Sequence, residues 1–218
     1  MKRSSTLAIT TAGRVGVAIV ADGTEHASTT TEQALSGALR CVRDVLTAAR
    51  IGIEDVELVA VCTGPGSFTG LRIGVALAKS IAQARELPVI GVSSYDVVDE
   101  GDAPFPRIAL VEGKRDFYYA RVVDDPSATP RLLSGSGEEL DAILPRGARN
   151  LADVSAGEQA LRIARIARGR AASGGGAGGW QAVEIDYGGR PNAVVNWERR
   201  RLAQERGGAA KSSNLKRG

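Results

Sequence analysis

The residues best placed to do chemistry lie in a glycine-rich turn between a buried strand and a helix. The turn consists of Gly64, Pro65, Gly66, Ser67, Phe68, Thr69, Gly70, Leu71 and Arg72. Glycine lets a backbone approach a ligand or another segment closely, and a helix N-terminus presents free N–H groups that favour anions. The residues alone therefore leave two interpretations open, a sterically tight corner and an anion or nucleotide site.

Two familiar phosphate-binding motifs fit this turn poorly. A P-loop ends in Gly-Lys followed by Ser or Thr, whereas here Gly70 is followed by Leu71 and Arg72. The dinucleotide fingerprint matches at its first two glycines, but Thr69 occupies the place of the third. The carboxylate expected after the next strand is displaced to Asp96. Both motifs are therefore weak interpretations of the turn.

Side chains for hydrolytic or metal chemistry are scarce. The single histidine, His26, lies in a Thr-rich strand pattern, where we expect a surface or packing role. The two cysteines, Cys41 and Cys62, read as small buried hydrophobes rather than as a disulfide framework. These residues cannot supply a histidine-rich metal site, and no nucleophile elbow accompanies His26. We therefore predict no catalytic residues, no metal centre and no hydrolase or protease activity.

The composition of the 218-residue chain is that of a globular protein. Hydrophobic residues make up 43% and aromatic residues only 4%, so the core must consist mainly of Val, Leu, Ile and Ala. A net charge of +3 permits contact with nucleic acid without requiring it. The N-terminus lacks the apolar region of a signal peptide, and no apolar run reaches membrane-spanning length. We expect a cytoplasmic protein without membrane contact.

The first half of the chain predicts the order β-β-β-α-β-α-β. Strands are expected at 6–11, 15–20, 24–31, 56–62 and 87–93, with helices at 32–50 and 71–86. The hairpin dipeptide Asp22-Gly23 makes the first three strands antiparallel, whereas the last strand–helix–strand unit requires a parallel pair. The expected fold class is therefore mixed α/β rather than a simple Rossmann alternation.

The second half begins after a polar, proline-bearing boundary at 99–106. Strands are expected at 107–112, 116–123 and 180–186, with helices at 138–144 and 155–170. The segment 173–179 reads SGGGAGG and has the composition of a flexible insert. A helical pattern begins at 192, and 204–218 is a basic tail, which we expect to be flexible.

The turn and its flanks closely resemble the TsaB family. The resemblance rests on GPGSFTGLRIG, the small-residue helix after it and the strand LPVIGVSS, with a thinner match near 116–119 and 187–193. It implies an actin-like, RNase H-like (ASKHA) fold of two lobes. The implied lobes are 1–98, joined by a helix near 192–203, and a smaller, divergent lobe at 99–191.

The resemblance also implies a function. TsaB proteins are non-catalytic partners of TsaD in transferring threonylcarbamoyl to the adenosine beside the tRNA anticodon, with the small ATPase TsaE as a further partner. ATP would be used by those partners, tRNA would be reached through the complex, and this chain would hold no cofactor. A second copy of the chain could form a homodimer through the same two helices. The implied interface residues are Leu35, Leu39, Val42, Leu46, Gly74, Ala78 and Ala82.

Three positions depart from the family pattern. Thr10 replaces a first-strand carboxylate that positions metal and phosphate in related ATPases. Thr30 replaces a histidine ahead of the matching Thr31 and Glu32, and Glu112 stands where Asp is more common. The missing carboxylate argues against ATP hydrolysis by this chain.

Two other functions stay open. A nucleotide-binding enzyme of the sugar-kinase or acetate-kinase type would share the fold, but it predicts a carboxylate in the first strand and a second glycine-rich loop. An RNA-binding accessory would act through the basic C-terminal end, which also reads as an ordinary frayed terminus. The basic residues there are Arg199, Arg200, Arg201, Arg206, Lys211, Lys216 and Arg217.

Overall fold

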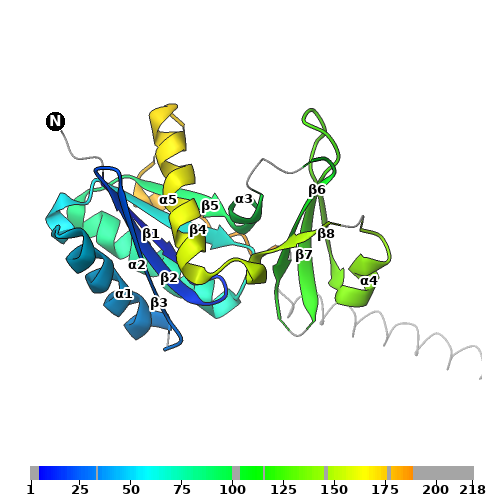
Figure 1. Ribbon diagram of the computed structural model, residues 1–218, viewed down its shortest axis with the longest axis horizontal. Helices are drawn as coiled ribbons and strands as arrows, with labels where there is room; N and C mark the ends of the chain where they lie inside the picture. Colours follow the sequence, from blue (N-terminus) through cyan, green and yellow to red (C-terminus); the bar gives the residue numbers. More distant parts are fainter. Residues whose placement is uncertain are drawn as a thin grey trace, which may run out of the picture. The chain divides into compact units, whose positions relative to one another are not determined.

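The computed structural model describes residues 5–32, 34–99, 104–114, 116–144, 147–175 and 178–188 (Figure 1). The expected helix near 192–203 and the basic tail at 204–218 lie outside these residues. None of the helices described is long and apolar enough to cross a membrane.

Five strands form the first sheet in the order β3-β2-β1-β4-β5. They are β1 (Ser5–Thr10), β2 (Val15–Ala21), β3 (Thr24–Thr30), β4 (Leu58–Gly64) and β5 (Val89–Ser93). The first three pair antiparallel, whereas β4 pairs in parallel with β1 and with β5. Asp22 and Gly23 have φ values of 49° and 80°, as a two-residue hairpin requires. The predicted mixed sheet is confirmed.

Helices cover both faces of this sheet. On one face lie α1 (Ala34–Ala49) and α2 (Phe68–Arg85), which share a buried cluster with Leu7 and Ile9 of β1. On the other face lies α5 (Ala156–Ala172), which packs against Ala8 through Ile163. Because β1 is buried on both sides, its sequence STLAIT lacks the strict alternation of a half-exposed strand.

Four strands form the second sheet in the order β8-β7-β6-β9 (Figure 1). They are β6 (Arg107–Glu112), β7 (Phe117–Val123), β8 (Arg131–Ser136) and β9 (Arg149–Asn150). The remaining elements are the short helices α3 (Ser94–Val98) and α4 (Gly137–Asp141), with the 3₁₀ turns η1 (Ile53–Asp55), η2 (Leu151–Asp153) and η3 (Trp180–Ala182). A mixed first sheet with helices on both faces, followed by a second sheet, agrees with the expected actin-like fold.

The structure corrects several expected elements. The strand expected at 180–186 is wrong, because Trp180–Ala182 forms a 3₁₀ turn and Val183 then enters the core. The elements β8, β9 and α3 were not expected. Both cysteines are buried, as predicted, and His26 is half-buried on β3.

A chain of ion pairs joins the second sheet to α3 and α5. Asp96 of α3 accepts hydrogen bonds from Arg121 of β7 at 2.5 Å and from Arg170 of α5 at 2.6 Å. Arg121 also lies 3.6 Å from Asp99, which pairs with Arg107 at 3.4 Å. The side chains of Asp96, Asp99, Arg107 and Arg121 are mostly buried, so their removal leaves charge poorly solvated.

Replacing Asp96, the carboxylate at the centre of these ion pairs, should destabilise the fold. We expect Asp96→Asn to lower the free energy of unfolding by about 1–2 kcal/mol, a figure reduced from that of a fully buried pair because water reaches these groups. Asp124→Asn, which breaks the exposed pair with Arg131, should cost under about 0.5 kcal/mol. Urea denaturation of both variants measures the difference, and equal losses would contradict it.

Candidate functional site

The glycines of the turn at 64–72 make room for the chain's own backbone. A Cβ atom added at Gly70 would overlap the carbonyl oxygen of Thr11, and one added at Gly64 would overlap the carbonyl oxygen of Asp186. Gly64 also has a φ of 108°, a conformation that other residues rarely adopt. The space that glycine leaves at these positions is therefore filled by protein, which favours the steric interpretation of the turn.

Hydrogen bonds fix the turn to the end of β1. The Thr11 hydroxyl donates to the carbonyl oxygen of Gly70 at 2.7 Å, and the Ser67 N–H donates to that of Ala12 at 2.6 Å. Ser67 also caps α2, because its hydroxyl accepts from the Gly70 N–H. The helix consequently begins at Phe68, three residues earlier than predicted, and with its cap it takes up most of the turn.

The other side of the turn is held by two later segments. The Ser94 hydroxyl donates to the carbonyl oxygen of Pro65 at 2.6 Å, and the Asp186 N–H donates to that of Thr63 at 2.8 Å. The ring of Phe68, which is 52% exposed, lies 4.8 Å from the Tyr187 ring, measured between centroids. Segments before, after and far beyond the turn thus enclose it, and Phe68 is left at the surface.

The expected interface residues divide into two groups. Gly74, Ala78 and Ala82 are buried, and Ala78 and Ala82 belong to the core that α2 shares with the first sheet. Val42 is likewise buried, and Leu46 packs against the same core. These five residues therefore face the chain's own sheet, and Leu46 alone among them keeps part of its surface exposed.

Other side chains on the same two helices are exposed. Leu35 and Leu39 of α1 are 52% and 51% exposed. On α2, the exposed residues include Ala76 and Ser80, which the sequence reasoning missed because burial cannot be assigned among small residues from spacing alone. This surface, defined by Leu35, Leu39, Ala76 and Ser80, is called the helix face below.

A cleft of about 780 Å³ opens where the end of the first sheet meets the second. The lining comprises Ala12, Gly13, Arg14, Thr29, Thr30, Thr31, Ser67, Glu112, Gly113, Leu151, Ala152, Val154, Ser155, Ala156 and Gln159. Among these described lining residues, Arg14 is the one cation and Glu112 the one carboxylate. The volume suits a small molecule, whereas no group of three His, Cys, Asp or Glu side chains in the described part of the chain could hold a metal.

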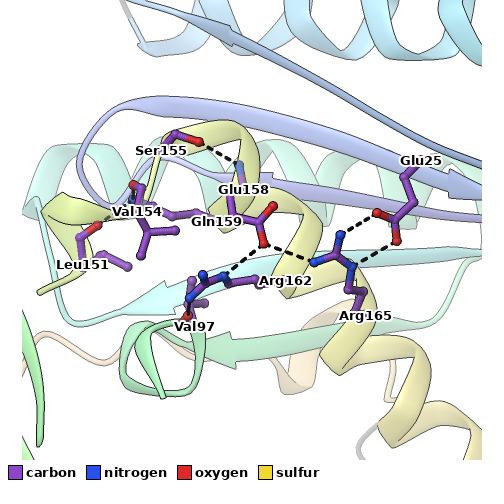
Figure 2. A network of polar contacts seen from close by, with 9 residues as sticks. All are labelled: Glu25, Val97, Leu151, Val154, Ser155, Glu158, Gln159, Arg162 and Arg165. Atoms are coloured by element: carbon purple, nitrogen blue, oxygen red, sulfur yellow. Dashed lines mark hydrogen bonds and ion pairs between the residues drawn. The ribbon is translucent and has the colours of Figure 1, made fainter. Parts of the chain in front are cut away.

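Next to Gln159 of the cleft lining, Thr10 stands in place of the carboxylate of related ATPases. Thr10 is fully buried, and its hydroxyl lies 3.5 Å from the Oε1 atom of Gln159 on α5. The Gln159 amide donates to the carbonyl oxygens of Leu151 at 3.0 Å and Val154 at 2.8 Å (Figure 2). The end of β1 therefore holds neutral groups that bond to one another and offers no ionised oxygen to a metal.

Charged residues along α5 fasten this helix to β3 and α3. Arg165 forms two hydrogen bonds with the Glu25 carboxylate, at 2.5 and 3.0 Å, and a third with Glu158 at 3.1 Å (Figure 2). Arg162 also donates to Glu158 and to the carbonyl oxygen of Val97, each at 3.1 Å. The hydrogen bonds from Arg165 lower the pKa of Glu25 below its usual value of 4.5.

Comparisons with known proteins identify relatives of this chain. The family model described as "TsaD: tRNA N6-adenosine threonylcarbamoyltransferase" matches residues 28–142. The tRNA threonylcarbamoyladenosine biosynthesis protein TsaB of Escherichia coli (strain K12) is 39% identical over 146 residues, which are 63% of this chain and 61% of that protein. The chain thus matches less than two thirds of the length of that relative.

Two further proteins extend the comparison. A tRNA N6-adenosine threonylcarbamoyltransferase of Ligilactobacillus salivarius (strain UCC118) is 41% identical over 76 residues, 33% of this chain and 22% of the other. The solved structure of YeaZ from Pseudomonas aeruginosa superimposes with a TM-score of 0.64 at 20% identity, covering 84% of this chain and 99% of that one. The structural likeness shows a shared fold.

A methyl group added inside the turn should test its steric role. We expect Gly70→Ala to lower the free energy of unfolding by about 2–4 kcal/mol, because the new Cβ meets the Thr11 carbonyl. Gly13→Ala is the matched control, since nothing lies within 4 Å of a Cβ there, and it should change stability by under about 0.5 kcal/mol. Equal effects in denaturant titrations would show that close backbone contact does not explain the turn.

Acid should loosen the contact between α5 and β3. Because the folded pKa of Glu25 lies below 4.5, its contribution to stability is fully present above pH 4.5 and is lost as the pH falls through the lowered value. The stability difference between the wild type and Glu25→Gln should therefore shrink in that window. The same comparison in an Arg165→Gln background should show little pH dependence. If the stability difference depends on pH there as it does with Arg165 present, groups other than Arg165 cause the effect.

Proposed function

Because the chain belongs to the TsaD family and is TsaB-like within it, we propose that it takes part in forming threonylcarbamoyladenosine on tRNA as a non-catalytic partner subunit. Its partner in this proposal is a TsaD-type threonylcarbamoyltransferase. The small ATPase TsaE is a further proposed partner, ATP is used by these partners, and tRNA is reached through the complex in the cytoplasm.

Two features of the first lobe support a non-catalytic role. The turn at 64–72, which could have held an anion, is enclosed by the backbone of Thr11, Ala12 and Asp186. At the end of β1, the buried Thr10 and the cleft residue Gln159 form a pair of neutral side chains. The end of β1 thus lacks the carboxylate that positions metal and phosphate in related ATPases, and the charged residues that line the cleft are Arg14 and Glu112.

The observation that carries the partner role is the exposure of Leu35 and Leu39. Two large apolar side chains one turn apart on α1 lie half in water, although the helix buries other residues in the core. Such a patch on a folded chain is typical of a protein-binding surface. The small residues Ala76 and Ser80 on α2 would let a partner helix approach closely, and a second copy of the chain could use the same face to form a homodimer.

A charge placed on the helix face should separate the chain from its partner. We expect Leu39→Arg to abolish co-purification with the TsaD subunit of the same organism, because the new guanidinium would be buried in the contact. Ala48→Arg, on the opposite side of α1 and also exposed, is the control and should retain the partner. Circular dichroism should show both variants folded, since neither position is in the core.

The functional test is rescue of a strain depleted of its own TsaB. The wild type and Ala48→Arg should restore threonylcarbamoyladenosine in bulk tRNA, and Leu39→Arg should not. Rescue by Leu39→Arg would remove the helix face from the proposal. Failure of the wild type in the presence of its cognate TsaD would argue against the role in tRNA modification.

A further inference from the structure

The charged side chains of helix α2 are all cations. Its 18 residues include Arg72, Lys79 and Arg85 but no Asp or Glu, and Glu86 follows only as the C-cap. Arg85 donates to the backbone oxygen of Glu54 at 3.0 Å, and the guanidinium of Arg72 lies 5.5 Å from the centre of the Phe68 ring. Among the residues described, no carboxylate forms an ion pair with any of the three cations.

The neighbouring helix is more nearly balanced. Arg40 of α1 pairs with Glu32 at 2.6 Å, and Arg43 lies 4.0 Å from Asp44. The excess positive charge of the two helices therefore belongs to α2. The two helices contact each other directly, so this charge is carried by the immediate neighbour of the helix that bears Leu35 and Leu39.

The two helices also share one direction. Each leads from the end of one strand to the start of another, and β3, β4 and β5 all run parallel to β1. The first turns of both helices consequently lie at the same end of the sheet, where β3 and β4 finish. Leu35 of α1 and Phe68 of α2 lie in these turns, and Arg72 follows one turn into α2. Arg72 and Lys79, seven residues apart, share one side of α2, whereas Arg85 is turned toward Glu54. The helix face is thus accompanied by two cations of α2.

We infer that this charge selects the partner: the helix face fits a different protein that presents carboxylates opposite α2, and it disfavours a second copy of this chain. The inference rests on the proposed function, which makes the helix face the interface. A two-fold pair through the same face would bring the α2 cations of both copies into one contact. Like charges opposed in an interface weaken it, whereas facing carboxylates strengthen it and speed encounter.

Salt should therefore act in opposite directions on the two kinds of pairing. Raising ionic strength from about 0.1 M to about 1 M shortens the screening length from about 10 Å to about 3 Å. Sedimentation of the full chain alone should show self-association that strengthens with salt. Binding to the purified TsaD subunit, followed by surface plasmon resonance, should weaken over the same range. Self-association that is unchanged or weakened by salt would overturn the inference.

Charge reversal supplies the matched variants. Arg72→Glu and Lys79→Glu should each weaken binding to the TsaD subunit by roughly tenfold at low salt and should pair with the wild-type chain more readily than the wild type pairs with itself. Lys114→Glu, the same change at an exposed position between β6 and β7, should leave both measurements unchanged. If all three variants change the two measurements equally, the net charge of the protein explains the result. That outcome would overturn the inference that the cations of α2 select the partner.

The two proposals fail in distinguishable ways. If TsaD does not bind at any salt concentration, the proposed function fails, while the sedimentation measurements still decide whether α2 opposes self-pairing. If TsaD binds equally at both salt concentrations, the interface stands and selection by charge is wrong. If the chain alone is monomeric at every salt concentration, the salt dependence of TsaD binding is the measurement that tests selection by charge.

Discussion

The close contact between the end of β1 and the turn at 64–72 is the constraint on which the rest of the first lobe depends. The backbone at Thr11 and Ala12 comes so near to Gly66 and Gly70 that a side chain at either glycine would collide with it. That approach places Ser67 as the cap of α2, and α2 in turn positions α1 and the helix face. A family signature that resembles a phosphate loop is here explained by steric fit.

Small residues also allow close packing on the other face of the sheet. Ala8 and Ala60 of adjacent strands share a buried cluster with Ala164 and Ala167 of α5. Small residues on both sides let α5 lie close to the sheet. The ion pairs of Arg165 and the hydrogen bonds of Gln159 then fix its rotation and its N-terminal end, so α5 closes one wall of the cleft.

Much of the first lobe could be predicted from the sequence because its signals are local. Asp22-Gly23 specifies the hairpin, and the stretch from Val56 to Ser93 carries a strand–helix–strand pattern with a glycine corner. The sequence could not show which side of α2 is buried, because Gly74, Ala76, Ala78 and Ser80 are all small. It also missed β8, whose residues Arg131–Ser136 lack a clear alternation and form a strand through pairing with β7.

The segment after η3 has a consequence for the order of assembly. Asp186 and Tyr187 complete the enclosure of a turn that begins at Gly64, about 120 residues earlier in the chain, and closing so long a loop is entropically slow. On the ribosome, the strands and helices of the first lobe can form while the turn still lacks this cover. The signature turn therefore receives its last cover only after the chain has been made as far as Tyr187.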